Sequence, residues 1–161
     1  MIRAVLLVLV VVACGPGSRG GPSMNNRIGG PDPVAQSSDV ISGDILAREP
    51  VTNSSQVKHI LISWKSLEQG GKDPRAKDRT KEQAETLVRS LMTQLKAGAD
   101  FDMLMKQHSE DPGSAANARA YPVSPDAQLV IEFKQLGMRL DVNEVGVVQS
   151  DFGFHIMKRI E

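Results

Sequence analysis

A chain of 161 residues has room for one domain of ordinary size and a leading segment. Its 19 basic and 19 acidic side chains cancel, so the net charge gives no reason to expect nucleic acid as a partner. The single cysteine, Cys14, lies near the N-terminus, which excludes disulfides and thiol chemistry from the folded part.

The first residues have the pattern of an export signal. Arg3 precedes an apolar run, Ala4–Ala13, that is too short to span a bilayer comfortably and ends in small residues directly before Cys14. This ending resembles the bacterial lipoprotein signal, in which the cysteine becomes the lipidated first residue. We predict a signal peptide over residues 1–13 and an exported protein whose lipidated Cys14 attaches it to a bacterial membrane, facing the periplasm where two membranes are present. An ordinary secretory signal with a chance cysteine is the alternative.

From residue 14 to residue 55 the composition shifts to glycine, proline, serine and asparagine. Such a segment buries too little apolar surface to offset the entropy of ordering it, so we predict a flexible linker. Val40–Leu46 is a stretch within it that could form a short local element. The folded domain is then predicted over residues 56–161.

Two stretches at opposite ends of this domain have the pattern of strands that carry one histidine each. In Val57–Ser63, a period of two places His59 on one face. In Phe152–Glu161, the same period places His155 on one face and most apolar side chains on the other. That apolar face carries Phe152, Phe154, Ile156 and Ile160.

Two amphipathic helices are predicted after a polar loop over residues 64–79. The first begins at Thr80, where Gln83 completes a capping box, and ends at Gly98. The second begins at Asp100. The apolar stripe of the first is Ala84, Leu87, Val88, Leu91 and Leu95, and the second carries Phe101, Leu104, Met105 and His108 on one face.

The remaining predicted elements are shorter. Ser109–Ser114 predicts a turn or a short third helix, and Arg119–Val123 predicts a strand. Ser124 followed by Pro125 predicts the start of a fourth helix, and Val145–Val148 predicts a strand that leads into the last one. This order of elements predicts an α+β fold with a small, mainly antiparallel sheet.

Six motifs follow one another along the predicted domain. They are Val57–Ile62, Phe101 with Leu104, Ser109–Ser114, Leu129 with Phe133, Asn143–Val145 and Phe152–Ile156. In order and spacing they resemble the parvulin family of peptidyl-prolyl cis–trans isomerases. The resemblance implies a four-stranded, mainly antiparallel sheet surrounded by four helices. It also implies activity on Xaa-Pro bonds of unfolded or exported polypeptides.

The resemblance assigns roles to individual residues by position. The implied catalytic residues are the paired sheet histidines His59 and His155, the substrate-facing Asp111 and the hydrogen-bonding Ser150. The implied substrate-binding residues are Leu129, Phe133, Tyr121 and Phe154. One stretch departs from the family: Ala118–Pro122 replaces the usual Gly-Gly-Asp-Leu-Gly, and Tyr121 stands in place of a pocket leucine.

Isomerising an Xaa-Pro bond breaks no covalent bond, so we expect neither a cofactor nor a metal. The barrier of about 18–20 kcal/mol comes from the partial double-bond character of the peptide C–N bond. A catalyst needs an apolar socket for the proline ring and polar groups that favour the twisted amide over the planar one. The predicted function is therefore noncovalent peptidyl-prolyl isomerisation that assists the folding of exported proteins.

Several alternatives stay open at this stage. His59 and His155 could be core residues that orient the strands, or could ligate a metal together with Asp111, although no His-x-His or Glu-x-x-His motif accompanies them. The basic residues of loop 64–79 could hold a phosphate or could simply be solvated. The domain could also bind peptides as a chaperone without catalysing isomerisation, or serve only as a structural lipoprotein.

Overall fold

The computed structural model describes residues 38–161, and the predicted signal peptide, Cys14 and the predicted linker up to residue 37 lie outside the described residues. Within residues 38–161, no helix is long and apolar enough to cross a membrane. The helices are α1 (Gly43–Leu46), α2 (Lys81–Lys96), α3 (Phe101–His108), α4 (Pro112–Asn117) and α5 (Ile131–Gly137), with a 3-10 helix, η2 (Pro74–Ala76). The strands are β1 (Ser55–Ile62), β2 (Tyr121–Val123), β3 (Val145–Ser150) and β4 (Gly153–Arg159).

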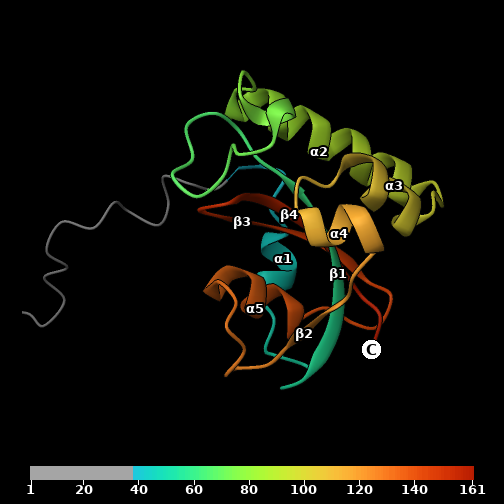
Figure 1. Cartoon of the computed structure of the whole chain (residues 1–161). Coiled ribbons are helices and arrows are strands. Elements are labelled where there is room, and N and C mark those ends of the chain that lie inside the picture. Colours follow the sequence, from blue (N-terminus) through green and yellow to red (C-terminus); the bar gives the residue numbers. More distant parts are fainter. Residues whose placement is uncertain (1–37) are drawn as a thin grey trace, which may run out of the picture. The chain divides into compact units, whose positions relative to one another are not determined.

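The strands form one antiparallel sheet in the order β2-β1-β4-β3, so the two histidine-bearing strands are the central pair (Figure 1). Helices cover both faces of this pair, which is why apolar residues occupy both alternations of β1 and β4. The register places His59 opposite Met157 and Leu61 opposite His155. The predicted α+β fold with a four-stranded antiparallel sheet is confirmed.

Helices lie on both faces of the sheet (Figure 1). The buried apolar side chains accordingly form two clusters, one on each face. On one face, α2 and α3 pack against strand residues that include Ile60 and Ile156. On the other face, α1 and α5 pack against strand residues that include Val57 and Met157. Successive residues of β4 therefore belong to opposite clusters, as a period of two predicts.

The N-caps predicted for the first two helices are present. Thr80 Oγ1 accepts the N–H of Gln83 at 3.3 Å, and Gln83 Oε1 accepts the N–H of Thr80 at 2.9 Å, which forms the capping box of α2. Asp100 is the N-cap of α3. The short third helix also forms as α4, and Asp111 caps it by accepting the N–H of Ser114 at 2.9 Å. A residue predicted to face the substrate thus also begins a helix.

The last helix begins later than its sequence signal. Ser124 and Pro125 predict a helix start, but the chain forms a turn there, closed by an Ala127 N–H that donates to the Ser124 carbonyl at 3.1 Å. α5 begins only at Ile131 and has no side-chain cap. The turn leaves the six residues before α5 outside the helix, and the last three of them, Gln128, Leu129 and Val130, line a cavity described below.

The domain also begins before its predicted start at residue 56. Residues 38–54, which we call the N-terminal strap, pack on the sheet and add a fifth α-helix, α1, to the four predicted. The N–H of Ser42 donates to the Val147 carbonyl at 2.9 Å, and the Val147 N–H donates to Ser42 Oγ at 2.9 Å. Ile45 is buried against Gly146. A Cβ on Gly146 would lie only 3.1 Å from Ile45 Cδ1, so the absence of a side chain there leaves room for Ile45. These contacts offset the ordering entropy that favoured a linker up to residue 55.

Candidate functional site

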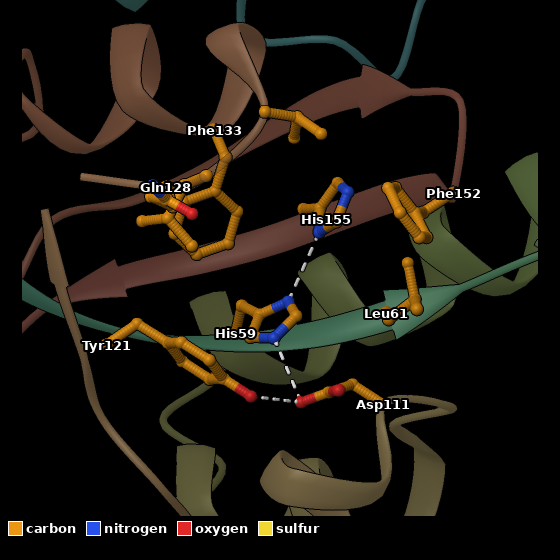
Figure 2. Close-up of a pocket in the computed structure, with 10 residues that line it drawn as sticks. His59, Leu61, Asp111, Tyr121, Gln128, Phe133, Phe152 and His155 are labelled. Atoms are coloured by element: carbon orange, nitrogen blue, oxygen red, sulfur yellow. Dashed lines mark hydrogen bonds and ion pairs between the residues drawn. The ribbon is translucent and has the colours of Figure 1, made fainter. Parts of the chain in front are cut away.

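A cavity of about 240 Å³ opens on the face of the sheet that α5 covers (Figure 2). Its walls come from both central strands, the start of α4, strand β2, the turn before α5, α5 itself and the turn between β3 and β4. The lining residues are His59, Leu61, Asp111, Tyr121, Gln128, Leu129, Val130, Phe133, Phe152 and His155. Six of the predicted site residues line this cavity, and a seventh, Ser150, contacts its lining.

The two sheet histidines meet because β1 and β4 are paired in a register that brings both to one face. His59 and His155 are each 5% exposed, and their rings stack with centroids 5.3 Å apart and planes 26° apart. Their Nδ1 atoms lie 3.2 Å from each other. Burial of two imidazoles in contact requires that each nitrogen find a hydrogen-bonding partner.

A chain of hydrogen bonds supplies these partners. Ser150 Oγ lies 2.7 Å from Nε2 of His155, and Nε2 of His59 lies 3.3 Å from Oδ2 of Asp111 (Figure 2 shows the histidine and aspartate contacts). An ionised carboxylate only accepts, so Nε2 of His59 carries a hydrogen. With both imidazoles neutral, one arrangement then fits: His155 donates from Nδ1 to His59, and Ser150 donates to His155. In this arrangement each hydrogen bond of the series donates toward Asp111.

The surroundings set the charges of this group. The His59 hydrogen bond holds the pKa of the Asp111 carboxyl well below its usual range, with Tyr121 and Ser114 adding to the shift and burial opposing it. Burial lowers the pKa of His155 to about 3, and the neighbouring His59 acts in the same direction. Burial raises the pKa of Tyr121 to about 12. At neutral pH the site thus holds an aspartate anion, a neutral His155 and a protonated phenol.

The other side of the cavity is apolar. The Phe133 ring is nearly perpendicular to both imidazoles, with centroids 5.1 Å from His59 and 5.4 Å from His155. Leu129, in the turn before α5, and Tyr121, in β2, also line the cavity and pack with Phe133. The structure thus brings these three predicted substrate-binding residues into one cavity (Figure 2 shows Phe133 and Tyr121).

Phe154, the fourth predicted substrate-binding residue, does not reach the cavity. It is fully buried on the opposite face of the sheet, with its ring centroid 5.0 Å from that of Trp64. Phe152 lines the cavity instead, although the predicted strand placed both phenylalanines on one face. The alternation fails because β4 begins only at Gly153, whose φ of +136° follows a two-residue turn that contains Phe152.

Several contributors to the site were not predicted. Leu61 shares a face with His59, so the period of two could have indicated it, whereas Gln128 and Val130 lie in the turn taken for a helix. Ser114 donates its hydroxyl to Oδ2 of Asp111 at 2.7 Å. Its position three residues after an N-cap aspartate was the available signal.

The two arginines of loop 64–79 form internal contacts. Arg79 donates to the Ser63 carbonyl at 2.9 Å and forms an ion pair with the buried carboxylate of Glu110. Arg75 bonds to both oxygens of Asp73 at 2.9 Å and also donates to the Ser109 carbonyl at 2.8 Å. These bonds fasten the loop to the segment that carries Asp111.

The histidines and Asp111 are arranged in a row. Among residues 38–161, no three His, Cys, Asp or Glu side chains are grouped so that they could hold a metal ion. The arrangement positions charge and hydrogen-bond donors beside an apolar surface, and that is the chemistry it offers.

The family model described as PPIC-type PPIASE domain matches residues 44–161. The chain is 27% identical over 129 residues to the foldase protein PrsA of Geobacillus kaustophilus, which covers 78% of this chain and 46% of that protein. It is 31% identical over 109 residues to the chaperone SurA of Chromohalobacter salexigens, which covers 67% of this chain and 22% of that protein. The chain spans less than half the length of these curated relatives.

A solved structure has the same fold. The peptidyl-prolyl isomerase ESS1 from Candida albicans matches with a TM-score of 0.58 and 21% identity, over 68% of this chain and 63% of that chain. At this level of identity the likeness concerns the fold alone.

Proposed function

Because the chain belongs to the PPIC-type peptidyl-prolyl isomerase, or parvulin, family, we propose that its domain isomerises Xaa-Pro bonds. Its clients would be unfolded or exported polypeptides, which it helps to fold. Support comes from the relatives named as a foldase and a chaperone, and from the cavity itself.

The observation that carries the proposal is that one cavity combines an apolar wall with a series of hydrogen-bonded polar side chains that ends at Asp111. A proline ring packs against Phe133 and Leu129, and its peptide bond then lies beside the imidazole of His59 and the carboxylate of Asp111. The socket holds the ring while the bond that precedes it rotates. Such a site accelerates rotation to the extent that it favours the twisted amide over the planar one.

Asp111 supplies the electrostatic part of this preference. The planar amide is stabilised by conjugation, which shifts negative charge to the carbonyl oxygen. An anion in the cavity wall therefore raises the energy of the planar form more than that of the twisted form. His59 holds the carboxylate through its Nε2–H, and His155 with Ser150 fixes the tautomer of His59. No side chain attacks the client.

A proline-limited peptide assay with trace amounts of protein tests the proposal. The wild type should accelerate isomerisation, and Asp111→Asn should lower kcat/KM by about 10-fold or more, since it removes the charge and keeps the shape and the helix cap. Asp126→Asn, at an exposed position of the turn before α5, is the matched control and should leave kcat/KM unchanged. Absence of catalysis in the wild type would overturn the proposal.

Binding of clients without catalysis is the second candidate, and the stretch Ala118–Pro122 favours it. Ala118 adopts a left-handed backbone with φ of +50°, a conformation that is strained for a residue with a Cβ, and the Tyr121 ring lines the cavity in place of a leucine. If proline peptides bind to the wild type but are not turned over, this candidate replaces the first one.

The clients need no phosphate, in our proposal. Arg75 and Arg79, the two guanidinium groups of loop 64–79, already bond to Asp73, Glu110 and backbone carbonyls, which leaves them little capacity to bind a phosphate. Paired Ser-Pro peptides with and without a phosphate should have kcat/KM values within a few-fold of each other. A strong preference for the phosphorylated peptide would contradict this.

We further propose that the protein is exported and anchored to a membrane through a lipid on Cys14. Two or more acyl chains are needed for stable anchoring, as a lipidated N-terminal cysteine can provide. Cys14→Ser should move intact protein to the soluble fraction. A variant that stays with membranes after a salt wash would indicate a different attachment.

A further inference from the structure

The Tyr121 hydroxyl makes the shortest hydrogen bond of the site. It donates to Oδ2 of Asp111 at 2.6 Å, and the ionised acceptor makes this a strong bond of its kind. The same oxygen lies 2.7 Å from Ser114 Oγ and 3.3 Å from Nε2 of His59 (Figure 2 shows the tyrosine and histidine contacts). Within residues 38–161, every hydrogen bond to this carboxylate goes to Oδ2, so Oδ1 remains for a client.

The phenol is held in this position from several sides. The pairing of Tyr121 with Val57 sets its ring beside His59, two residues further along β1, with centroids 5.1 Å apart. The Phe133 ring is edge-on to the Tyr121 ring, with centroids 6.2 Å apart, and the Arg119 guanidinium lies 5.1 Å from the Tyr121 centroid. Moving the phenol oxygen away from Asp111 would require these ring contacts to change together.

Gly113 leaves the space that the hydroxyl occupies. A Cβ at this position would lie 2.9 Å from Tyr121 Oη, closer than side chains tolerate. The backbone of Gly113 is that of an ordinary helical residue in α4, so alanine is otherwise compatible with it. An alanine there would displace the hydroxyl without removing any polar group.

We propose that Tyr121 is a positioning residue of the isomerase site: its hydroxyl fixes the Asp111 carboxylate so that Oδ1 faces the client. This inference rests on the proposed isomerase function. It assigns to Tyr121 a role beyond lining the pocket, in the stretch where the chain departs from its family.

Tyr121→Phe tests the inference because it removes the hydroxyl and keeps the ring. We expect kcat to fall about 10-fold, the worth of one hydrogen bond to a charged group, with KM within about 2-fold of the wild type. In an Asp111→Asn background, the same substitution should have almost no further effect. If Tyr121 acted only by lining the pocket with its ring, loss of the hydroxyl would leave kcat unchanged.

A readout independent of catalysis separates this inference from the proposed function. The pKa of the Asp111 carboxyl, followed by carbon NMR, should rise in Tyr121→Phe because the ionised form loses a donor. Gly113→Ala keeps every polar group and should change both quantities in the same direction as Tyr121→Phe does: kcat should fall and the pKa of Asp111 should rise. An unchanged kcat and an unchanged Asp111 pKa in Tyr121→Phe would overturn the inference. A shifted pKa in a protein without isomerase activity would overturn the proposed function and leave the hydrogen bond confirmed.

Discussion

The two faces of the sheet are built from alternate residues of the same strands, yet they are used differently. On the face that α2 and α3 cover, Phe154 and Ile156 are fully buried among apolar side chains. On the face that α5 covers, His155 alternates with them and borders a cavity. The first face stabilises the fold, and the second holds a buried polar group at the edge of a cavity. Substitutions one residue apart should therefore have different consequences.

Phe154→Ala should have the largest effect on stability. Removing a fully buried phenylalanine from the closed face should lower the free energy of unfolding by about 3–5 kcal/mol. Urea denaturation measures this change. Phe152→Ala, at a half-buried residue on the cavity side, is the control and should cost no more than about 1 kcal/mol. Equal costs for both would remove the distinction between the faces.

Ile45→Ala sharpens the comparison within the α5 side, because Ile45 belongs to the apolar cluster there but does not line the cavity. We expect a loss of about 2–4 kcal/mol in the free energy of unfolding, with kcat/KM unchanged.

Limited proteolysis of the wild type should leave a resistant core that begins close to residue 38. A core that begins near residue 56 would show that the N-terminal strap does not contribute to the fold.

Phe133→Ala should act mainly on activity. The proline ring loses its apolar wall, which should lower kcat/KM by about 10- to 100-fold, the worth of burying one such side chain. The cost in stability should be smaller than for Phe154→Ala, because Phe133 already borders a cavity. Isomerase assays and urea denaturation on the same samples give both values. A variant that loses stability but keeps full activity would place the client elsewhere.

A buried histidine also makes the cavity face sensitive to acid. The pKa of His155 is lowered from its usual value near 6.5 to about 3, so between these values the unfolded chain binds a proton that the folded chain does not. The contribution of His155 to the free energy of unfolding is then fully present above pH 6.5, and it declines as the pH falls toward 3. In His155→Gln, the denaturation midpoint should depend less on pH across this range than it does in the wild type. An equal slope in the variant would assign the acid sensitivity to other groups.

Local signals predicted much of this molecule. The capping box at Thr80 and the N-cap at Asp100 depend on residues three apart, and the alternation of β1 and β4 depends on residues two apart. The two histidines could be assigned to one site from the family resemblance, and the structure then brought their rings into contact.

What the sequence did not reveal depends on contacts between distant residues or on a change of backbone. The N-terminal strap is ordered because Ile45 fits beside Gly146, about a hundred residues away, which no local pattern records. Phe152 reached the cavity because a turn reset the alternation before Gly153. The bond from Tyr121 to Asp111 depends on how β2 registers with β1. Each of these follows from tertiary structure.

The two outer strands of the sheet bear on how such a protein could work among unfolded chains. An exposed strand edge can recruit another extended chain and so promote aggregation. Pro122 lies in β2 and has no N–H to offer, while the N–H and carbonyl of Val147 in β3 are already taken by Ser42. Both edges thus resist the addition of a further strand. A client would meet the cavity without being drawn into the sheet, and the domain would not seed the assembly of the chains it handles.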